Sequence, residues 1–151
     1  MSAYKWKTGS QIKANANIAG AVCEELEQTV GLTAQTLLDA SRPEDAPLHN
    51  EFEWNDEKAA EEYRQMQARY IIRSLCVDAE VEGRIEPVRA YFMVTNSRYE
   101  NVAVVISEQE KRTAVLDMAM RELKAFEHKY KQLVELQPIM DAIEQVAASG
   151  L

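Results

Sequence analysis

The side chains that could do chemistry are few and scattered along the 151 residues. The two histidines, His49 and His128, have no HxxxH, HExxH or Cys/His spacing around them, as a zinc site would need. The glycines form no phosphate-binding loop, and no GxSxG motif or catalytic cysteine setting occurs. Carboxylates are plentiful, but in an acidic helical protein they usually form solvated faces. We therefore expect no enzyme activity, no catalytic residues, no metal site and no cofactor.

The segment RPEDAPLHNEFEWND, residues 42 to 56, holds two prolines, a histidine and two aromatic residues. Pro43 and Pro47 cannot lie in a helix interior, so residues 41 to 54 should form a loop. We interpret this loop as a structural clasp, in which His49 bonds backbone carbonyls and Trp54 packs as a hydrophobic staple near Ala59. The clasp residues are Pro47, Leu48, His49, Phe52 and Trp54. A peptide-binding groove built on Trp54 is the alternative, since tryptophan anchors many interfaces.

Charge is unevenly distributed in a chain whose net charge is -8. The first 23 residues contain Lys5, Lys7 and Lys13 and no acid, whereas acids crowd residues 24 to 57. The acidic total opposes non-specific binding to nucleic acid, yet a basic arm could contact a phosphate backbone or an acidic partner. A frayed terminus with solvated lysines is the other interpretation.

The segment LEQTVGLTAQTLLDA, residues 26 to 40, has features of a DNA-binding helix-turn-helix. Gly31 lies in the turn, but Glu27 stands where a small residue is usual, and the second helix holds an acid and no base. If DNA is bound, the lysine arm should lie on the same side as the start of the second helix. The candidate contacts are Thr33, Gln35 and Thr36 for bases and Lys5, Lys7, Lys13 and Arg42 for phosphates.

Hydrophobic periodicity predicts the elements that position these residues. A helix over residues 11 to 29 should end at a Gly31 cap, and Thr33 should cap a short helix through residue 40. Asn55 should then be the N-cap of a helix that ends near Cys76. Its buried stripe is predicted to contain Ala59, Tyr63, Met66 and Tyr70, widened by Ala60, Ile71 and Leu75. Its outer face should carry Glu61, Glu62, Arg64, Arg69 and Arg73.

The later part of the chain predicts a hairpin and a long helix. VRAYFMVT and NVAVVIS are rich in β-branched and aromatic residues, and NSRYE between them supplies turn residues. Ser107 and Glu110 match a capping box, and IMDAIEQVA after Pro138 should form a short closing helix. A heptad seam runs through Leu116, Ala119, Leu123, Phe126, Tyr130 and Leu133. This seam should pack on the Tyr63 to Tyr70 stripe, with a homodimer through residues 116 to 133 as the alternative.

The predicted fold is mainly α with one β-hairpin (α+β), with a small N-terminal helix-turn-helix-like unit and two long packed helices. One domain should span residues 1–151: a flexible basic arm (1–10), the helix-turn-helix-like unit and clasp loop (11–54), and then helix, hairpin, long helix and short C-terminal helix (55–151). No apolar run of 18 residues and no signal sequence occurs, so we expect a cytoplasmic protein without a membrane partner. Cys23 and Cys76 should be buried free thiols.

The run GLTAQTLLDASRPEDAPLHNEFEWNDEKAAEEYRQMQAR, followed by VRAYFMV and RELKAFEHKYKQL, resembles a family of small proteins encoded by bacteriophages and integrated prophages. The specific part is the pattern RPEDxPLHxxFEWxxxxAAxxYRxxQAR, and the whole resemblance covers residues 31 to 133 loosely. It implies a bacterial cytosolic setting and a phage origin. It carries no catalytic residues over to this chain.

The sequence thus predicts a non-enzymatic, phage-type accessory protein that acts by binding. DNA or a DNA-bound complex is the first expected target. The alternative is a protein-binding module with a host or phage protein as partner. Such a module would be an inhibitor of a host system with an acidic, DNA-like surface, or a small phage assembly component.

Overall fold

The computed structural model describes residues 3–56, 58, 60–95 and 97–150. The protein is mainly α-helical with small antiparallel sheets, so the predicted fold class is confirmed. The chain divides into two compact units, residues 1–103 and residues 104–151, where the sequence predicted one domain.

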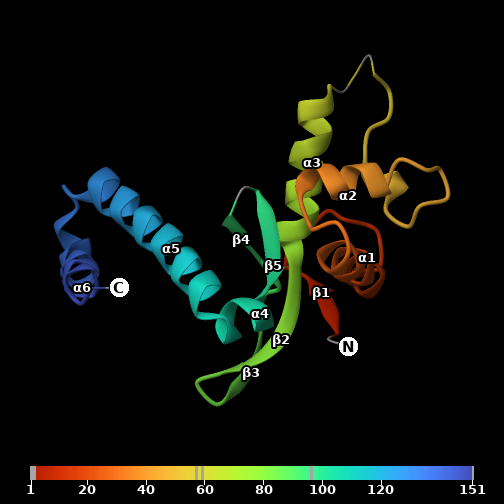
Figure 1. Cartoon of the computed structure of the whole chain (residues 1–151). Helices are drawn as coiled ribbons and strands as arrows, with labels where there is room; N and C mark the ends of the chain where they lie inside the picture. The colour runs from red at the N-terminus through yellow and green to blue at the C-terminus, as the bar shows by residue number, and fades with distance from the viewer. Residues whose placement is uncertain (1–2, 57, 59, 96, 151) are drawn as a thin grey trace. The chain divides into compact units, whose positions relative to one another are not determined.

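The first unit contains two β-sheets and three α-helices among its described residues (Figure 1). Strand β1 (Tyr4–Trp6) precedes helices α1 (Ala16–Gln28) and α2 (Ala34–Ala40), the 3-10 turn η1 (His49–Glu51) and helix α3 (Glu61–Ser74). Strands β2 (Leu75–Val81), β3 (Arg84–Arg89), β4 (Tyr91–Thr95) and β5 (Arg98–Asn101) follow. One sheet has the order β1-β2-β3 and the other pairs β4 with β5, all antiparallel. Strand β1 lies where a flexible arm was predicted.

Helix α4 (Val102–Ser107) spans the boundary between the units, and the second unit is helical over its described residues. Helix α5 (Gln109–Tyr130) is followed by the 3-10 turn η2 (Val134–Leu136) and by α6 (Gln137–Ala148). Helix α6 packs against α5 and buries Met140 and Ile143. Pro138 lies in the first turn of α6, where a missing N–H costs nothing, so the predicted closing helix is confirmed.

Local capping signals determine how α1 ends and α2 begins. Gly31 has a φ of +90°, and its N–H donates to Leu26 O over 2.7 Å at the end of α1. The Thr33 side chain then accepts from Thr36 N–H over 3.0 Å, while Thr33 N–H donates to Thr36 Oγ1 over 2.9 Å. The predicted caps at Gly31 and Thr33 are therefore confirmed, although α1 begins at Ala16 and not at residue 11.

Tyr4 joins strand β1 to the core. Its hydroxyl donates to Glu24 Oε1 over 2.6 Å and lies 3.1 Å from the Tyr91 hydroxyl, and the two rings stack with centroids 6.3 Å apart. Its N–H donates to Asn17 Oδ1 over 2.7 Å. The ring lies directly on Gly20 of α1, where an added Cβ would be 2.1 Å from Tyr4 Cδ2. Burial raises the pKa of both Tyr4 and Tyr91, so both hydroxyls stay protonated.

Helix α3 differs from its prediction at its start and in part of the face that it buries. It begins at Glu61 and ends at Ser74, and Asn55 instead lies in a turn, where its carbonyl accepts from Lys58 N–H over 2.9 Å. Tyr63 and Met66 are 49% and 60% exposed, while the buried side is formed by Arg64, Ala68, Ile71 and Ile72. Of the predicted stripe, Ile71 and Leu75 are buried as predicted, whereas Tyr63 and Met66 lie outside the buried side, and Ala59 lies outside the described residues.

The predicted hairpin was wrong in its second strand. Residues 98–100 of the supposed turn form β5 together with Asn101, and this strand pairs with β4, while residues 102–107 form helix α4. The side chain of Asn101 accepts from Ala103 N–H over 3.0 Å, so this residue turns the chain from strand to helix. The predicted capping box also fails, because α5 begins at Gln109 and Ser107 Oγ donates to Val104 O over 3.1 Å.

Strand β3 is an edge strand whose outer side carries a proline. Ala90 N–H donates to Leu75 O over 3.0 Å, and inward and outward N–H groups alternate along an antiparallel strand. The backbone nitrogens of Ile85, Pro87 and Arg89 therefore face away from β2. Because Pro87 has no N–H, the central donor of this open edge is missing, which disfavours pairing with another strand.

The contact between Tyr4 and Gly20 predicts that the effect of Gly20→Ala on the free energy of unfolding changes sign when Tyr4 is replaced. Gly20→Ala alone should destabilise the first unit by about 1 to 3 kcal/mol, because the new methyl group overlaps the Tyr4 ring. In a Tyr4→Ala background the same change should stabilise by up to about 1 kcal/mol, since alanine is the better helix former. Urea unfolding followed by tryptophan fluorescence measures this, because Trp6 and Trp54 both lie in the first unit. Equal effects in the two backgrounds would contradict the contact.

The edge of β3 predicts the effect of Pro87→Val. Restoring the outward N–H and adding a β-branched residue should increase self-association, measured by light scattering over time at fixed concentration. Glu86→Val is the matched control, because the N–H of residue 86 already faces β2 and only the side chain changes. Association no faster than in this control would show that the missing donor does not protect the edge.

Candidate functional site

The start of α2, which was predicted to contact DNA bases, uses its polar side chains within the fold. Thr33 and Thr36 cap the helix, and Thr36 Oγ1 also donates to Gly31 O over 2.7 Å. Gln35 Nε2 donates to Asp39 Oδ1 over 3.0 Å, and Gln35 Oε1 accepts from Gln65 Nε2 over 2.9 Å. These groups already have partners inside the first unit, so contacts to bases would have to replace them.

The cations predicted to contact phosphates mostly lie beside carboxylates or aromatic rings. Arg42 Nε lies 2.8 Å from Asp39 Oδ1, and Arg42 Nη2 lies 2.6 Å from Glu61 Oε1. These contacts, the hydrogen bond to Asp39 first, raise the pKa of the Arg42 guanidinium. Lys5 Nζ lies 2.6 Å from Asp78 Oδ2. Such pairing reduces the positive potential that a phosphate backbone would meet.

The lysine arm and the start of α2 flank different sides of α3. Lys7 Nζ lies 5.1 Å from the centre of the Tyr70 ring, and Lys13 N–H donates to Glu51 Oε1 over 3.0 Å. Thr33 and Gln35 instead line a hollow with Gln65 and Arg69 of α3. At 100° per residue Tyr70 is roughly 120° from the side that carries Gln65 and Arg69. Lys7 and the start of α2 therefore lie on different sides of α3, whereas the expected arrangement placed them on one side.

The clasp loop is held by stacking and by backbone hydrogen bonds. Leu48 and Phe52 are buried in the core, and the chain turns at Pro47, where His49 N–H donates to Ala46 O over 3.0 Å. His49 Nδ1 lies 3.0 Å from Ser41 O. The Trp54 ring stacks on the His49 ring with centroids 4.8 Å apart, and its Nε1–H donates to His49 O over 2.7 Å. Trp54 is half-buried, and its polar atom is used inside the loop, as a structural role requires.

Arg64 connects this loop to α3, and the sequence placed it on the wrong face. It is only 6% exposed, its Nε–H donates to Glu53 O over 2.8 Å, and its guanidinium binds Asp56 and lies 5.4 Å from the Trp54 ring. The available signal was its spacing of four and seven residues from Ala68 and Ile71, which marks it as part of the buried stripe.

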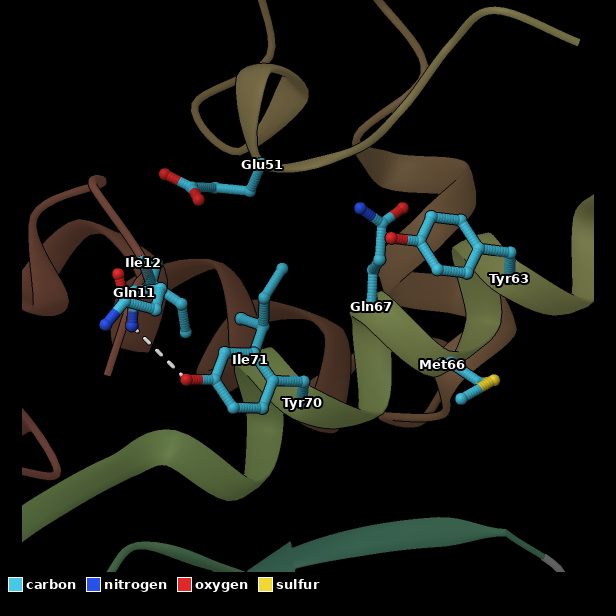
Figure 2. A pocket seen from close by; sticks show the side chains of 8 residues that line it. All are labelled: Gln11, Ile12, Glu51, Tyr63, Met66, Gln67, Tyr70 and Ile71. Atoms are coloured by element: carbon cyan, nitrogen blue, oxygen red, sulfur yellow. Dashed lines mark hydrogen bonds between the residues drawn. The ribbon is translucent and has the colours of Figure 1, made fainter. Parts of the chain in front are cut away.

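An open hollow of about 340 Å³ lies between α3 and the segment before α1 (Figure 2). We call it the α3 groove; its lining residues are Gln11, Ile12, Glu51, Tyr63, Met66, Gln67, Tyr70 and Ile71. Ile12 and Ile71 provide apolar surface, and the carboxylate of Glu51 lies at the rim. Tyr63, Met66 and Tyr70 were predicted to lie in the core, and for this reason the groove was not predicted from the sequence.

The polar groups around the α3 groove fix its walls. Glu51 Oε1 accepts from Ala14 N–H over 2.7 Å as well as from Lys13 N–H, which ties η1 to the segment before α1. Tyr70 Oη accepts from Gln11 N–H over 3.2 Å on the opposite side, as Figure 2 shows. This backbone donor, with further contributions from Ser10 and the nearby Lys7, lowers the pKa of Tyr70.

The remaining reactive side chains form no recognisable site. Cys23 and Cys76 are both buried free thiols, as predicted, and burial raises the pKa of each. Over the described residues, no group of three or more His, Cys, Asp or Glu side chains could hold a metal ion. Within the same part of the chain, no helix combines the length and the apolar character that crossing a membrane would need.

Comparison of the chain with protein-family models, with curated proteins and with solved structures found no match. Interpretation of the site therefore depends on its own chemistry.

The contacts of Arg64 predict that Arg64→Lys destabilises the first unit by about 1 to 3 kcal/mol. An ammonium group cannot reproduce the fork that bonds Glu53 O and Asp56 together, and it leaves one of these groups without its donor. Urea unfolding followed by tryptophan fluorescence measures the loss. Arg73→Lys, on the exposed side of α3, should change the free energy of unfolding by less than about 0.5 kcal/mol. A similar loss in both variants would contradict the role of Arg64.

Proposed function

We propose that this chain is a non-enzymatic, phage-type accessory protein that binds another protein through the α3 groove. The observation that carries the proposal is the exposure of Tyr63 and Met66, at 49% and 60%, beside an apolar hollow. Interface cores are enriched in tyrosine and methionine, and methionine adapts its shape to different partners. On a folded surface these side chains are best explained by a partner that covers them.

The chemistry of the groove favours one kind of partner segment. Its floor accepts an apolar side chain, as in helices that dock their apolar face into a groove. Among the residues that line it, Glu51 alone is charged, and the loop from residue 44 to residue 56, which contains Glu51, holds acids and no lysine or arginine. We therefore propose that the partner presents an apolar side chain flanked by lysine or arginine, since opposite charges favour the correct partner and speed association.

The contacts of the first unit favour a protein partner over DNA. Arg42 and Lys5 are each paired with carboxylates, and Gln35 is bonded within the unit. DNA would have to displace these contacts while approaching a chain with a net charge of -8. A protein partner with basic residues meets neither obstacle.

A photo-crosslinking residue tests the proposal directly. Placed at position 66 in the bacterial host during phage growth, it should give one defined adduct with another protein, identified by mass spectrometry. Placed at Arg84, an exposed residue of β3, it should not, because this residue does not line the groove. Met66→Asp should keep the free energy of unfolding within about 0.5 kcal/mol and weaken binding of the identified partner at least tenfold.

Two results would contradict this function. The first is a crosslink from position 66 that forms only within the same chain. The second is saturable, salt-sensitive binding of duplex DNA that is weakened when Lys5, Lys7 and Lys13 are replaced together by alanine. We expect neither the intact protein nor this triple variant to bind duplex DNA at low salt, measured by fluorescence anisotropy.

A further inference from the structure

Helix α5 is long, yet its described residues contribute nothing to a buried core. It spans 22 residues, and none of them is buried. Among the described residues of the second unit, the buried apolar side chains are Val105, Met140 and Ile143. A pair of helices with so little buried surface gains little free energy from its own packing.

The heptad seam lies on a different side of α5 from the one that α6 occupies. Met120 and Lys124 line a hollow with Ala147 of α6, and Lys124 Nζ lies 2.5 Å from Glu144 Oε1. At 100° per residue, the seam is centred roughly 120° away from this side. Along the seam, Ala119 and Leu123 are exposed, while Leu116, Phe126 and Tyr130 are half-buried.

The seam has the composition of a helix-pairing surface. It carries Leu116, Ala119, Leu123, Phe126 and Tyr130 at a and d positions, and the last residue of the sequence repeat, Leu133, lies three residues beyond the end of the helix. Leu123 and Leu133 are 38% and 49% exposed, and the rings of Phe126 and Tyr130 contact each other with centroids 5.0 Å apart. This repeat suits a second helix of the same period.

We propose that α5 pairs with α5 of a second copy of this chain in an antiparallel orientation. Residues 123 and 126 of one copy would then form a central layer with residues 126 and 123 of the other. The charged residues beside the seam favour the antiparallel orientation over the parallel one. With Leu116 at position a, Glu122 and Lys129 occupy g positions, which face each other across an antiparallel pair.

Antiparallel pairing therefore brings Glu122 of each copy opposite Lys129 of the other, giving two attractive pairs. A parallel pair would instead bring Glu122 opposite Glu127 of the other copy twice, and like charges at such positions repel. The helix is thus complementary to itself in one orientation only. This surface is separate from the α3 groove and does not depend on the function proposed for it.

Charge reversal at Glu122 tests both the dimer and its orientation. Sedimentation equilibrium of the intact protein should show a concentration-dependent dimer. Glu122→Lys should weaken it roughly tenfold, since two attractive pairs become repulsive. Lys129→Glu should do the same, whereas an equimolar mixture of the two variants should form a heterodimer more stable than either homodimer. Asp117→Lys is the matched control, with the same charge change off the seam, and should leave the dissociation constant unchanged.

A monomer at every concentration would overturn the proposal. A dissociation constant that is the same for Glu122→Lys and for the unchanged protein would also overturn it. A tighter dimer with Glu122→Lys would overturn the antiparallel orientation, because it is the result expected of a parallel pair. Circular dichroism of each variant checks that α5 remains helical. The mixing experiment keeps the test valid even if one variant alone is poorly folded, because pairing with the other should restore its helicity.

Discussion

The first unit depends on an aromatic ring lying where a helix has no side chain. The Tyr4 ring occupies the space above Gly20, so strand β1 comes closer to α1 than any other residue at position 20 would allow. Its hydroxyl then reaches Glu24 and Tyr91, and its strand pairs with β2. One residue near the N-terminus thereby links α1 to both sheets. A buried polar network of this kind favours a single arrangement, because its members lose their partners in any other.

Several polar side chains of the first unit form hydrogen bonds or ion pairs within that unit. Arg64, His49 and Gln35 each bond to groups of the same unit, and Arg42 lies between two carboxylates. The surfaces that we propose for partners, the α3 groove and the seam of α5, are instead lined mainly by apolar side chains and aromatic rings.

The sequence predicted features that local chemistry decides and missed those that tertiary contacts decide. Gly31 and Thr33 were identified because a left-handed residue and a capping hydroxyl act within one turn of their position. Asn55 is also a residue type that favours an N-cap. The loop nevertheless continues beyond it to α3, and Arg64 of α3 holds this loop by donating to Glu53 O. Periodicity alone also could not choose between two neighbouring stripes of α3. The α3 groove stayed hidden for that reason, since the exposed stripe was assigned to the core.

The position of Tyr4 in the chain also decides when the first unit can fold during synthesis. Its hydroxyl bonds to groups that lie 87 and 97 residues further along the sequence. Until the ribosome has released the chain through Asn101, the Tyr4 hydroxyl lacks two of its partners, Tyr91 and Asn101, and β5 is not available to α1. At the usual elongation rate of about 5 to 20 residues per second, this interval after the synthesis of Tyr4 lasts roughly 5 to 20 s. The contacts of Tyr4 with Gly20 and Glu24 can form earlier, and the β4–β5 hairpin then completes the core.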